Sequence, residues 1–255
     1  MIKILKVILL FVLILTFTLI FILLQCLFIF LRKKRAYCIS QAIHIFSVIA
    51  ILIMGIRIKI KGFSDLRKKR GVFLVTNHIS YIDGLVASSI FPLVFIARGD
   101  LKEWPLFGLF SRVSETVFVN RTSYLNLHKE IEKVSSLLKN GINVILFPQG
   151  TTTSLIEAVS FRSSLFQAPI TSGSDIVPFT IKYKKINGQN IDDKNKDLVF
   201  WYGDMEFAPH LLSFLNLKNI EVEVEILSPI KISPQDDRKA VSVISQEAIN
   251  ANLNS

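Results

Sequence analysis

The stretch "VFLVTNHISYIDG", residues 72–84, joins a run of strand-forming residues to a histidine, a serine and an aspartate packed within six positions. Val72 to Thr76 is apolar and rich in β-branched residues, as in a buried strand, whereas Gly84 to Ser89 has a helical pattern. In sheets built from strand–helix units, ligands and reacting groups lie in the loops beyond the carboxyl ends of the strands. The polar residues of this stretch therefore stand where a functional site is expected.

The same alternation of strand and helix patterns continues through the rest of the chain. Short apolar or alternating runs predict strands, and apolar residues spaced three or four positions apart predict helices. Repeated strand–helix units predict an α/β fold, with a mostly parallel or mixed sheet flanked by helices. The further strands predicted are Ile56–Lys61, Leu93–Ala97, Thr116–Asn120, Asn143–Phe147, Ile176–Tyr183, Leu198–Tyr202 and Ile220–Leu227, and the further helices lie within Leu101–Val113, over the apolar face Leu127, Ile131, Val134 and Leu138 up to Gly141, and over Gln235–Leu253.

The N-terminal residues 1–55 are predicted to form a membrane anchor, ahead of a folded domain over residues 56–255. From Ile4 to Leu31 there is no charge after Lys6. This apolar run is long enough for a helix to cross a bilayer core of about 30 Å. A cleaved signal peptide would have a shorter apolar stretch and a small-residue cleavage site. A second apolar stretch, Gln41–Ile56, is short for a span.

Two arrangements of these N-terminal helices are compatible with the sequence. Both helices could cross as a hairpin, or one could span or insert deeply while the second stays shallow or re-entrant. The hairpin would put the "RKKR" of Arg32–Arg35 on the side opposite the cytoplasm, against the usual distribution of Lys and Arg. We therefore expect the second arrangement, with this "RKKR" and the one at Arg67–Arg70 on the cytoplasmic face of a bacterial inner membrane.

The net charge of +10 belongs to the N-terminal part of the chain. Residues 1–70 hold 13 of the 30 Lys and Arg but one of the 20 acids, whereas residues 71–255 hold 17 basic and 19 acidic residues. A nucleic-acid-binding protein would carry its basic residues on a folded face, so this class is excluded. Anionic membrane lipids are the expected partners. The two cysteines, Cys26 and Cys38, lie outside the folded domain and predict neither disulfides nor a metal site.

His78 and Asp83 form the pair with the clearest chemical potential. A neutral imidazole is a suitable general base near pH 7, and a carboxylate five residues on can orient it. Asn77 and Ser80 are predicted to support the loop by hydrogen bonds, with Ser80 able to cap the next helix. Judged by spacing alone, a structural histidine beside a capped helix is the competing interpretation. Ser80 lacks the flanking glycines of a nucleophile elbow.

Two further polar loops follow apolar strands. Arg121 comes directly after a strand, where a guanidinium can bind a phosphate bidentately or pair with a surface acid. "FPQGTTT", Phe147–Thr153, places Gly150 where a ligand or backbone comes close, and its N–H groups and hydroxyls can face an oxyanion or a phosphate. The loop lacks the lysine of a nucleotide-binding P-loop, and taken alone it is also compatible with an ordinary turn.

Together these loops resemble a known family. "NHISYID" has the form N-H-x-x-x-x-D, "VFVNR" is a strand followed by Arg, "FPQGTTT" is close to F-P-E-G-T, and "VPF" at Val177–Phe179 has a final V-P form. The same four blocks, in this order, mark the glycerolipid acyltransferases typified by 1-acyl-sn-glycerol-3-phosphate acyltransferase, also called lysophosphatidic acid acyltransferase. "ARGDLKEWPLFG", Ala97–Gly108, is also similar to a stretch of that family. The resemblance covers about residues 56–185.

The resemblance implies a role for each matching residue. His78 would remove the proton from a lysolipid hydroxyl and Asp83 would orient His78. Arg121 would hold the phosphate of the acceptor, and the acceptor site would be lined by Gln149, Gly150, Thr151 and Thr152. The acyl donor would be acyl-CoA or acyl carrier protein, with no metal or other cofactor required.

The resemblance also implies a substrate, with alternatives. The principal expectation is acyl transfer to 1-acyl-sn-glycerol-3-phosphate, giving phosphatidic acid for phospholipid synthesis. Gln149 stands where the family usually has Glu, and Thr152 where many members have Arg, so one acid and one cation are absent. The alternatives are another acceptor, such as a lyso-ornithine lipid or a lysophospholipid, and a non-catalytic membrane-tethered lipid-binding homologue. An intact His78–Asp83 pair argues against the last, because a binding protein needs no base.

Overall fold

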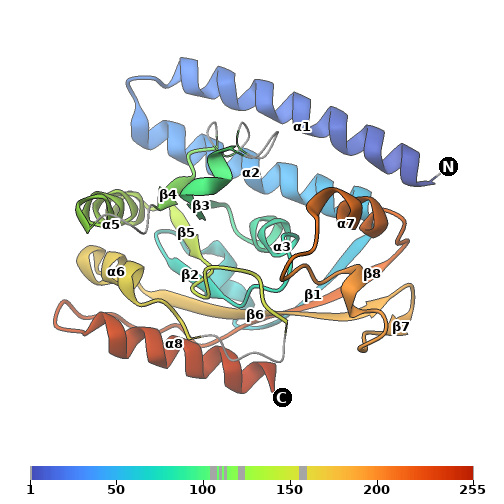
Figure 1. Cartoon of the computed structure of the whole chain (residues 1–255). Coiled ribbons are helices and arrows are strands. Elements are labelled where there is room, and N and C mark those ends of the chain that lie inside the picture. The colour runs from blue at the N-terminus through green and yellow to red at the C-terminus, as the bar shows by residue number, and fades with distance from the viewer. Residues whose placement is uncertain are drawn as a thin grey trace.

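The computed structural model describes residues 2–103, 108, 111, 114–119, 124–154 and 160–254. In this part of the chain a sheet forms the middle layer and helices cover both of its faces (Figure 1). Its strands, in spatial order, are β1 (Ile56–Gly62), β8 (Ile220–Ile226), β6 (Ile176–Ile186), β2 (Phe73–Thr76), β5 (Asn143–Leu146), β3 (Leu93–Arg98) and β4 (Val117–Val119), and β7 (Gln189–Asn190) pairs with the end of β6.

The sheet is mixed but mostly parallel, which confirms the predicted fold class. Strands β6, β2, β5, β3 and β4 run parallel to one another, whereas β8 runs antiparallel to β6 and β1 runs parallel to β8. Parallel strands place their carboxyl ends at one edge of the sheet. Because β5 and β6 are the two neighbours of β2, the loops after β2 and β5 lie beside each other at that edge.

Strand β2 is buried on both faces, which explains its unbroken apolar sequence. Phe73 and Val75 face a core formed with α5 (Tyr124–Lys139), α6 (Gln167–Ser172) and α8 (Arg238–Leu253), whereas Leu74 faces a second core formed with α2 (Arg32–Met54) and α3 (Asp83–Ile90). Each such side chain contributes about 1.5–3 kcal/mol when fully buried. The strand therefore forms a rigid base for the loop that follows it.

The two N-terminal helices pack side by side. Helix α1 (Ile2–Leu27) lies along α2 (Arg32–Met54), which in turn lies against α3 and β3 (Figure 1). Phe17 of α1 meets Phe46 of α2 edge to face, with ring centroids 5.4 Å apart. Both helices are long and apolar enough to cross a membrane by length and composition, but half of the most apolar window of α2 is buried within the protein, against 11% for α1.

The start of α2 corrects one prediction from the sequence. The second apolar segment was expected over Gln41–Ile56, but the helix begins at Arg32 and ends at Met54. The "RKKR" at residues 32–35 is therefore its first turn, because Lys and Arg are good helix formers whose side chains can extend into solvent.

Lys6 connects the pair of helices α1 and α2 to the rest of the domain. Its Nζ donates to the Met54 carbonyl at 2.9 Å and to the Leu217 carbonyl at 2.6 Å, and the residue is 7% exposed. A cation at the last carbonyls of a helix is favourable because it complements the helix dipole. The N-terminal end of α1 is therefore held at the end of α2.

The predicted strand at Leu198–Tyr202 is wrong. A short 3₁₀ helix, η4 (Lys196–Leu198), is followed by irregular backbone, and then by α7 (Phe207–Phe214). Val199 and Phe200 are buried as in a strand, but their neighbour Trp201 donates its backbone N–H to Ile79 in the loop after β2. This apolar segment packs beneath a loop, and its backbone does not join the hydrogen-bond ladders of the sheet.

Short 3₁₀ segments complete the described chain. They are η1 (Ser64–Lys68), η2 (Gly99–Glu103) and η3 (Ser164–Phe166).

Of the helix predicted within Leu101–Val113, most residues lie outside the described part of the chain. The C-terminal helix α8 was predicted from Gln235 but begins at Arg238, because the Asp237 side chain accepts two backbone N–H groups as its N-cap.

Candidate active site

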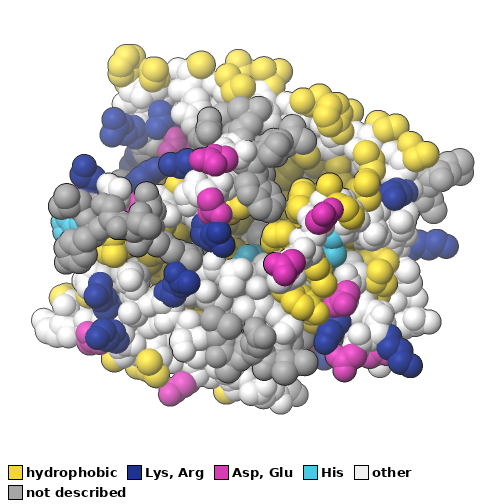
Figure 2. All heavy atoms as spheres, in the orientation of Figure 1, with side chains coloured by type: hydrophobic (Ala, Val, Ile, Leu, Met, Phe, Trp, Pro, Cys, Tyr) yellow, Lys and Arg dark blue, Asp and Glu magenta, His cyan; other side chains and the backbone are white. Residues whose placement is uncertain are grey.

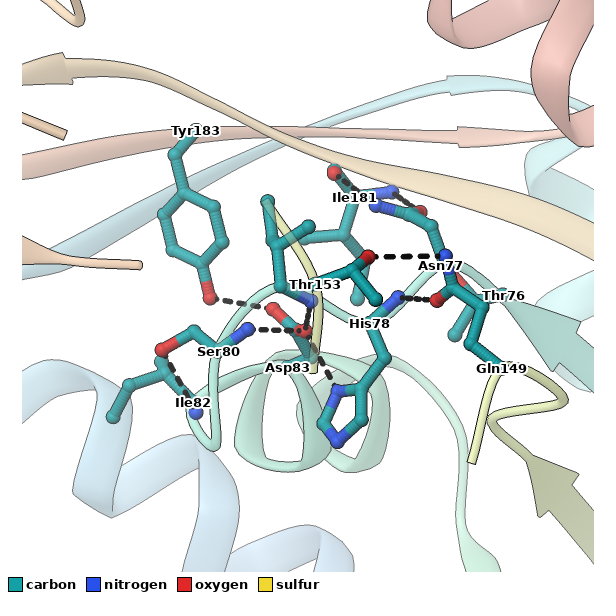
Figure 3. Close-up of polar contacts among 11 residues, drawn as sticks. Thr76, Asn77, His78, Ser80, Ile82, Asp83, Gln149, Thr153, Ile181 and Tyr183 are labelled. Carbon is teal, nitrogen blue, oxygen red and sulfur yellow. Dashed lines mark hydrogen bonds and ion pairs between the residues drawn. The ribbon is translucent and has the colours of Figure 1, made fainter. Parts of the chain in front are cut away.

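His78 and Asp83 lie together at the carboxyl end of β2. The His78 Nδ1 atom is 3.0 Å from the Asp83 Oδ2 atom (Figure 3). An ionised carboxylate only accepts hydrogen bonds, so Nδ1 carries the hydrogen and Nε2 has a free lone pair. The His78 side chain is 20% exposed, whereas that of Asp83 is fully buried. The Nε2 atom, which could accept a proton, thus points away from the buried Asp83 carboxylate.

Hydrogen bonds from the same loop hold the Asp83 carboxylate. Its Oδ2 atom accepts the backbone N–H groups of Ile79 at 2.7 Å and Ser80 at 2.9 Å. Its other oxygen, Oδ1, accepts the hydroxyl of Tyr183 from β6 at 2.8 Å. Such bonds to a charged acceptor are about twice as strong as neutral ones, and they offset the cost of burying the charge.

Asn77 extends the sheet by one step beyond β2. Its side-chain Oδ1 accepts the Ile181 N–H at 2.9 Å and its Nδ2 donates to the Ile181 carbonyl at 3.0 Å. The amide group thus imitates a backbone pair with β6, in a residue that is 1% exposed. This fixes the first residue of the loop immediately before His78.

Ser80 supports the loop differently from the cap that the sequence suggested. The N-cap position of α3 is Ile82 and has no side-chain cap bond, while the Ser80 Oγ accepts a long 3.4 Å contact from the Ile82 N–H. Asp83 satisfies the free N–H groups in front of the helix instead. The carboxylate therefore orders the loop and orients the histidine at once.

The loop after β5 clamps the backbone of His78. The Gln149 Oε1 accepts the His78 N–H at 2.7 Å, and the Thr153 N–H donates to the His78 carbonyl at 3.0 Å. The Gln149 Nε2 also donates to the Thr153 Oγ1 at 3.3 Å. On the same side, the Phe147 ring stacks on the imidazole with centroids 4.1 Å apart and planes inclined by 27°. These contacts leave the ring little freedom to turn.

The remaining predicted residues have different surroundings. Gly150 has φ of +77°, which only glycine adopts without strain, and its N–H closes a turn on the Phe147 carbonyl at 3.1 Å. Thr151 is exposed, whereas Thr152 is 8% exposed and packs inside. Arg121 lies outside the described residues.

An aromatic cluster supports the loop from the side of α7. Tyr81 packs edge to face against Phe207, and its hydroxyl lies 3.0 Å from the His210 Nδ1. The His210 Nε2 is 3.0 Å from the Phe200 carbonyl, to which it donates. Burial lowers the pKa of His210 and raises the pKa of Tyr81. His210 is thus neutral and accepts the Tyr81 hydroxyl hydrogen.

Sequence reasoning missed two of the residues that build this site. Tyr183 and Ile181 contact the dyad or its loop, yet they lie 100 and 104 residues along the chain from their partners, Asp83 and Asn77. The signal for Tyr183 would have been the register of β6 against β2, in which Thr76 pairs with Phe179. That register is set by tertiary packing and is not visible in the sequence.

Comparisons with known proteins agree on the class of protein. Residues 57–182 match the family model described as Acyltransferase. A lyso-ornithine lipid O-acyltransferase of Rhizobium meliloti (strain 1021) is 32% identical over 213 residues, which covers 80% of this chain and 72% of that protein. A second protein of that name, from Brucella abortus (strain 2308), is 29% identical and the match covers 89% of this chain and 87% of the relative.

Two further matches carry another acceptor in their names. A 1-acyl-sn-glycerol-3-phosphate acyltransferase of Neisseria meningitidis serogroup B is 26% identical, covering 80% of this chain and 76% of the relative. The crystal structure of the 1-acyl-sn-glycerophosphate acyltransferase from Thermotoga maritima superposes with a TM-score of 0.62 over 94% of both chains, at 21% identity. At that identity the superposition shows a shared fold.

Proposed function

Because this chain belongs to the acyltransferase family, we propose that it moves a fatty acyl group from an acyl thioester to the free hydroxyl of a lysolipid, with His78 as the base. The observation that carries this proposal is the 3.0 Å contact between His78 Nδ1 and the buried Asp83 carboxylate. It leaves Nε2, on the side of the ring away from Asp83, as the proton acceptor.

The reaction follows from this geometry. Nε2 of His78 removes the hydroxyl proton as the oxygen attacks the thioester carbonyl, and Asp83 stabilises the imidazolium that forms. The tetrahedral intermediate then collapses, the carbon–sulfur bond breaks, and the thiolate leaves as CoA or as acyl carrier protein. The imidazolium returns its proton to the sulfur. Gly150 and Thr151 are proposed to face the acceptor, as is Arg121.

The acceptor proposed first is a lyso-ornithine lipid, which the sequence alone ranked as the alternative. Two relatives carry that acceptor in their names, including the one at 32% identity. Neutral Gln149 and buried Thr152 replace an acid and a cation that family members often have, so these positions offer no charge to a phosphate. An ornithine headgroup carries an amine and a carboxylate. 1-Acyl-sn-glycerol-3-phosphate remains the second candidate, supported by the Neisseria relative.

We place the reaction at a membrane surface, on the cytoplasmic side of the inner membrane of a bacterium. Support comes from the exposed apolar side chains along α1, which form a band across the top of the molecule in Figure 2. In this arrangement α1 is the inserted helix and α2 lies between it and the domain. The more exposed of these side chains are Ile4, Leu5, Ile8, Phe11, Val12, Leu15, Leu19, Leu23 and Leu27.

One assay tests the proposal. Purified protein in nonionic detergent is given a panel of lysolipids, each with acyl-CoA or with acyl carrier protein as donor, and acylated product is measured by mass spectrometry. The expected result is product with lyso-ornithine lipid, and a fall of about 10²–10⁴-fold for His78→Ala, which is what a general base contributes in such reactions. Binding of lysolipid to His78→Ala should persist.

The outcomes separate the alternatives. Product with 1-acyl-sn-glycerol-3-phosphate alone would reverse the order of the two acceptors. Full activity of His78→Ala would remove the assignment of the base. Binding of lysolipids without turnover by the unaltered protein would identify a lipid-binding homologue.

A further inference from the structure

Tyr183 reaches Asp83 from a different part of the chain than the other groups that bind this carboxylate. The partners of Oδ2 are the His78 ring and two N–H groups of the same loop. The Tyr183 hydroxyl comes from β6, 100 residues later, and donates to Oδ1 at 2.8 Å (Figure 3). This contact links the catalytic loop to the middle of the sheet.

Both partners of this bond are shielded from water. Asp83 is 0% exposed and Tyr183 is 5% exposed, with its ring packed edge to face against Phe200. A buried carboxylate oxygen without a donor would carry a large desolvation cost. Burial, and then the charge of Asp83, raise the pKa of Tyr183 well above its ordinary value. The phenol therefore stays protonated and donates near neutral pH.

We propose that Tyr183 is a positioning residue that keeps His78 in its neutral, proton-accepting form by stabilising the Asp83 charge. This inference rests on the proposed role of His78 as the base. While His78 is neutral, the negative charge of Asp83 has no cation beside it, so the Tyr183 bond is worth most in this state. Once His78 has taken a proton, the imidazolium compensates that charge and the Tyr183 bond matters less.

The other polar and titratable groups around the pair do not replace this bond. Tyr81, in the same loop, has its hydroxyl on His210 of α7. The Gln149 side chain is neutral and contacts the His78 backbone. His44 of α2 contacts Ser88, further along α3. Among the described residues, the Tyr183 hydroxyl is thus the side-chain donor to Oδ1.

The test is the pH–rate profile of Tyr183→Phe, which removes one oxygen and keeps the ring. Without the donor, the pair should hold its proton to higher pH, so the acid limb of kcat/KM moves up by about 0.5–1 pH unit. Because the lost bond stabilises the neutral pair more than the imidazolium form, we expect kcat at the plateau and KM for the lysolipid each to stay within about threefold of the original. The control is Tyr202→Phe, because the Tyr202 hydroxyl donates to exposed Asp197 at 2.9 Å and not to the dyad.

A second measurement keeps the proposal testable if Tyr183→Phe folds poorly. Site-specific 3-fluorotyrosine at position 183 is a stronger donor of nearly the same shape, so the acid limb should move to lower pH. Shifts in opposite directions for the two replacements support the positioning role. An unmoved profile in either folded protein, even with reduced stability, would make Tyr183 a purely structural residue. Full activity of His78→Ala would instead overturn the proposed function itself, which separates the two failures.

Discussion

The contacts of Gln149 in the structure favour a role different from the one that the sequence suggested. The resemblance to acyltransferases suggested that it lines the acceptor site, where other members have Glu. In the structure both ends of its amide are occupied, one by the His78 N–H and the other by the Thr153 hydroxyl. These contacts favour a role in holding the catalytic loop over a role in binding the lysolipid.

The two roles of Gln149 predict different kinetics. Gln149→Ala leaves the His78 N–H without its acceptor, and loss of such a bond costs about 1–3 kcal/mol, so we expect kcat to fall about tenfold or more with KM little changed. Gln149→Glu keeps an acceptor of the same length and should retain activity within about fivefold. Steady-state kinetics with the preferred lysolipid measures both. Gln167→Ala is the matched control, because Gln167 makes the same kind of contact with exposed Thr171 in α6.

A rise in the KM of Gln149→Ala for the acceptor, with kcat intact, would contradict the positioning role. It would return Gln149 to the acceptor site that the sequence predicted.

At the scale of elements, the pattern of apolar residues was a good guide to strands that pair in the sheet. The runs at Val72–Thr76 and Asn143–Phe147 became β2 and β5, because a strand buried on both faces must be apolar throughout. The run at Leu198–Tyr202 has the same composition, but it is buried beneath the loop after β2. Composition reports burial, whereas the identity of the hydrogen-bond partner depends on the tertiary fold.

The same limit applies to the site. The His78–Asp83 contact was predictable, since five residues across a strand-to-helix junction suffice to bring the two together. The bonds from Tyr183 and Asn77 across to β6 were not, because they depend on the register between strands separated by a hundred residues.

Helix α7 should respond to pH through His210. Burial lowers the pKa of His210 from its ordinary value of 6.5, so above about pH 6.5 the residue is neutral in both the folded and unfolded states. As the pH falls below 6.5 the unfolded state takes up a proton first. The free energy of unfolding should therefore decrease, until the pH passes the lowered pKa of the folded state.

Denaturant unfolding between pH 7.5 and 5, followed by tryptophan fluorescence, measures this effect, because Trp201, one of the two tryptophans, packs against Phe207 of α7. His210→Gln should flatten the decrease, and His128→Gln should not, since the His128 side chain is 73% exposed. An equal decrease in His210→Gln would assign the pH dependence to other groups.

At the scale of the whole molecule, basic side chains and exposed apolar side chains lie next to each other where α1 connects to α2. A hollow of about 720 Å³ lies between the start of α2 and α5, and Ile29 from the connection between α1 and α2 lines it. Arg35 pairs with Glu115 at 2.6 Å within this hollow. Figure 2 shows basic side chains gathered here beneath the apolar corner of the molecule. Four further cations line the hollow and have no acidic partner among the described residues: Arg32, Lys33, Lys129 and Lys133.

This juxtaposition predicts how the protein would sit on a membrane. Leu27, Ile29, Phe30 and Leu31 are exposed at the tip, with Phe30 93% exposed, and would enter the acyl region. The cations beside them would then meet phosphates at headgroup depth, each contributing about 1 kcal/mol near an anionic surface. Lys129→Gln/Lys133→Gln should therefore weaken binding to vesicles containing phosphatidylglycerol by about 30-fold, at about 1 kcal/mol per charge.

Vesicle sedimentation at low and high salt measures this binding, and the difference between the proteins should shrink as salt screens the charges. The control is Lys184→Gln/Lys194→Gln, which removes the same charge near β7, at the opposite end of the molecule from α5 (Figure 1). If both double variants lose binding equally, net charge and not the hollow attracts the membrane. If neither loses binding, the apolar face of α1 is sufficient by itself, and the cations beside the hollow act on something other than the lipid surface.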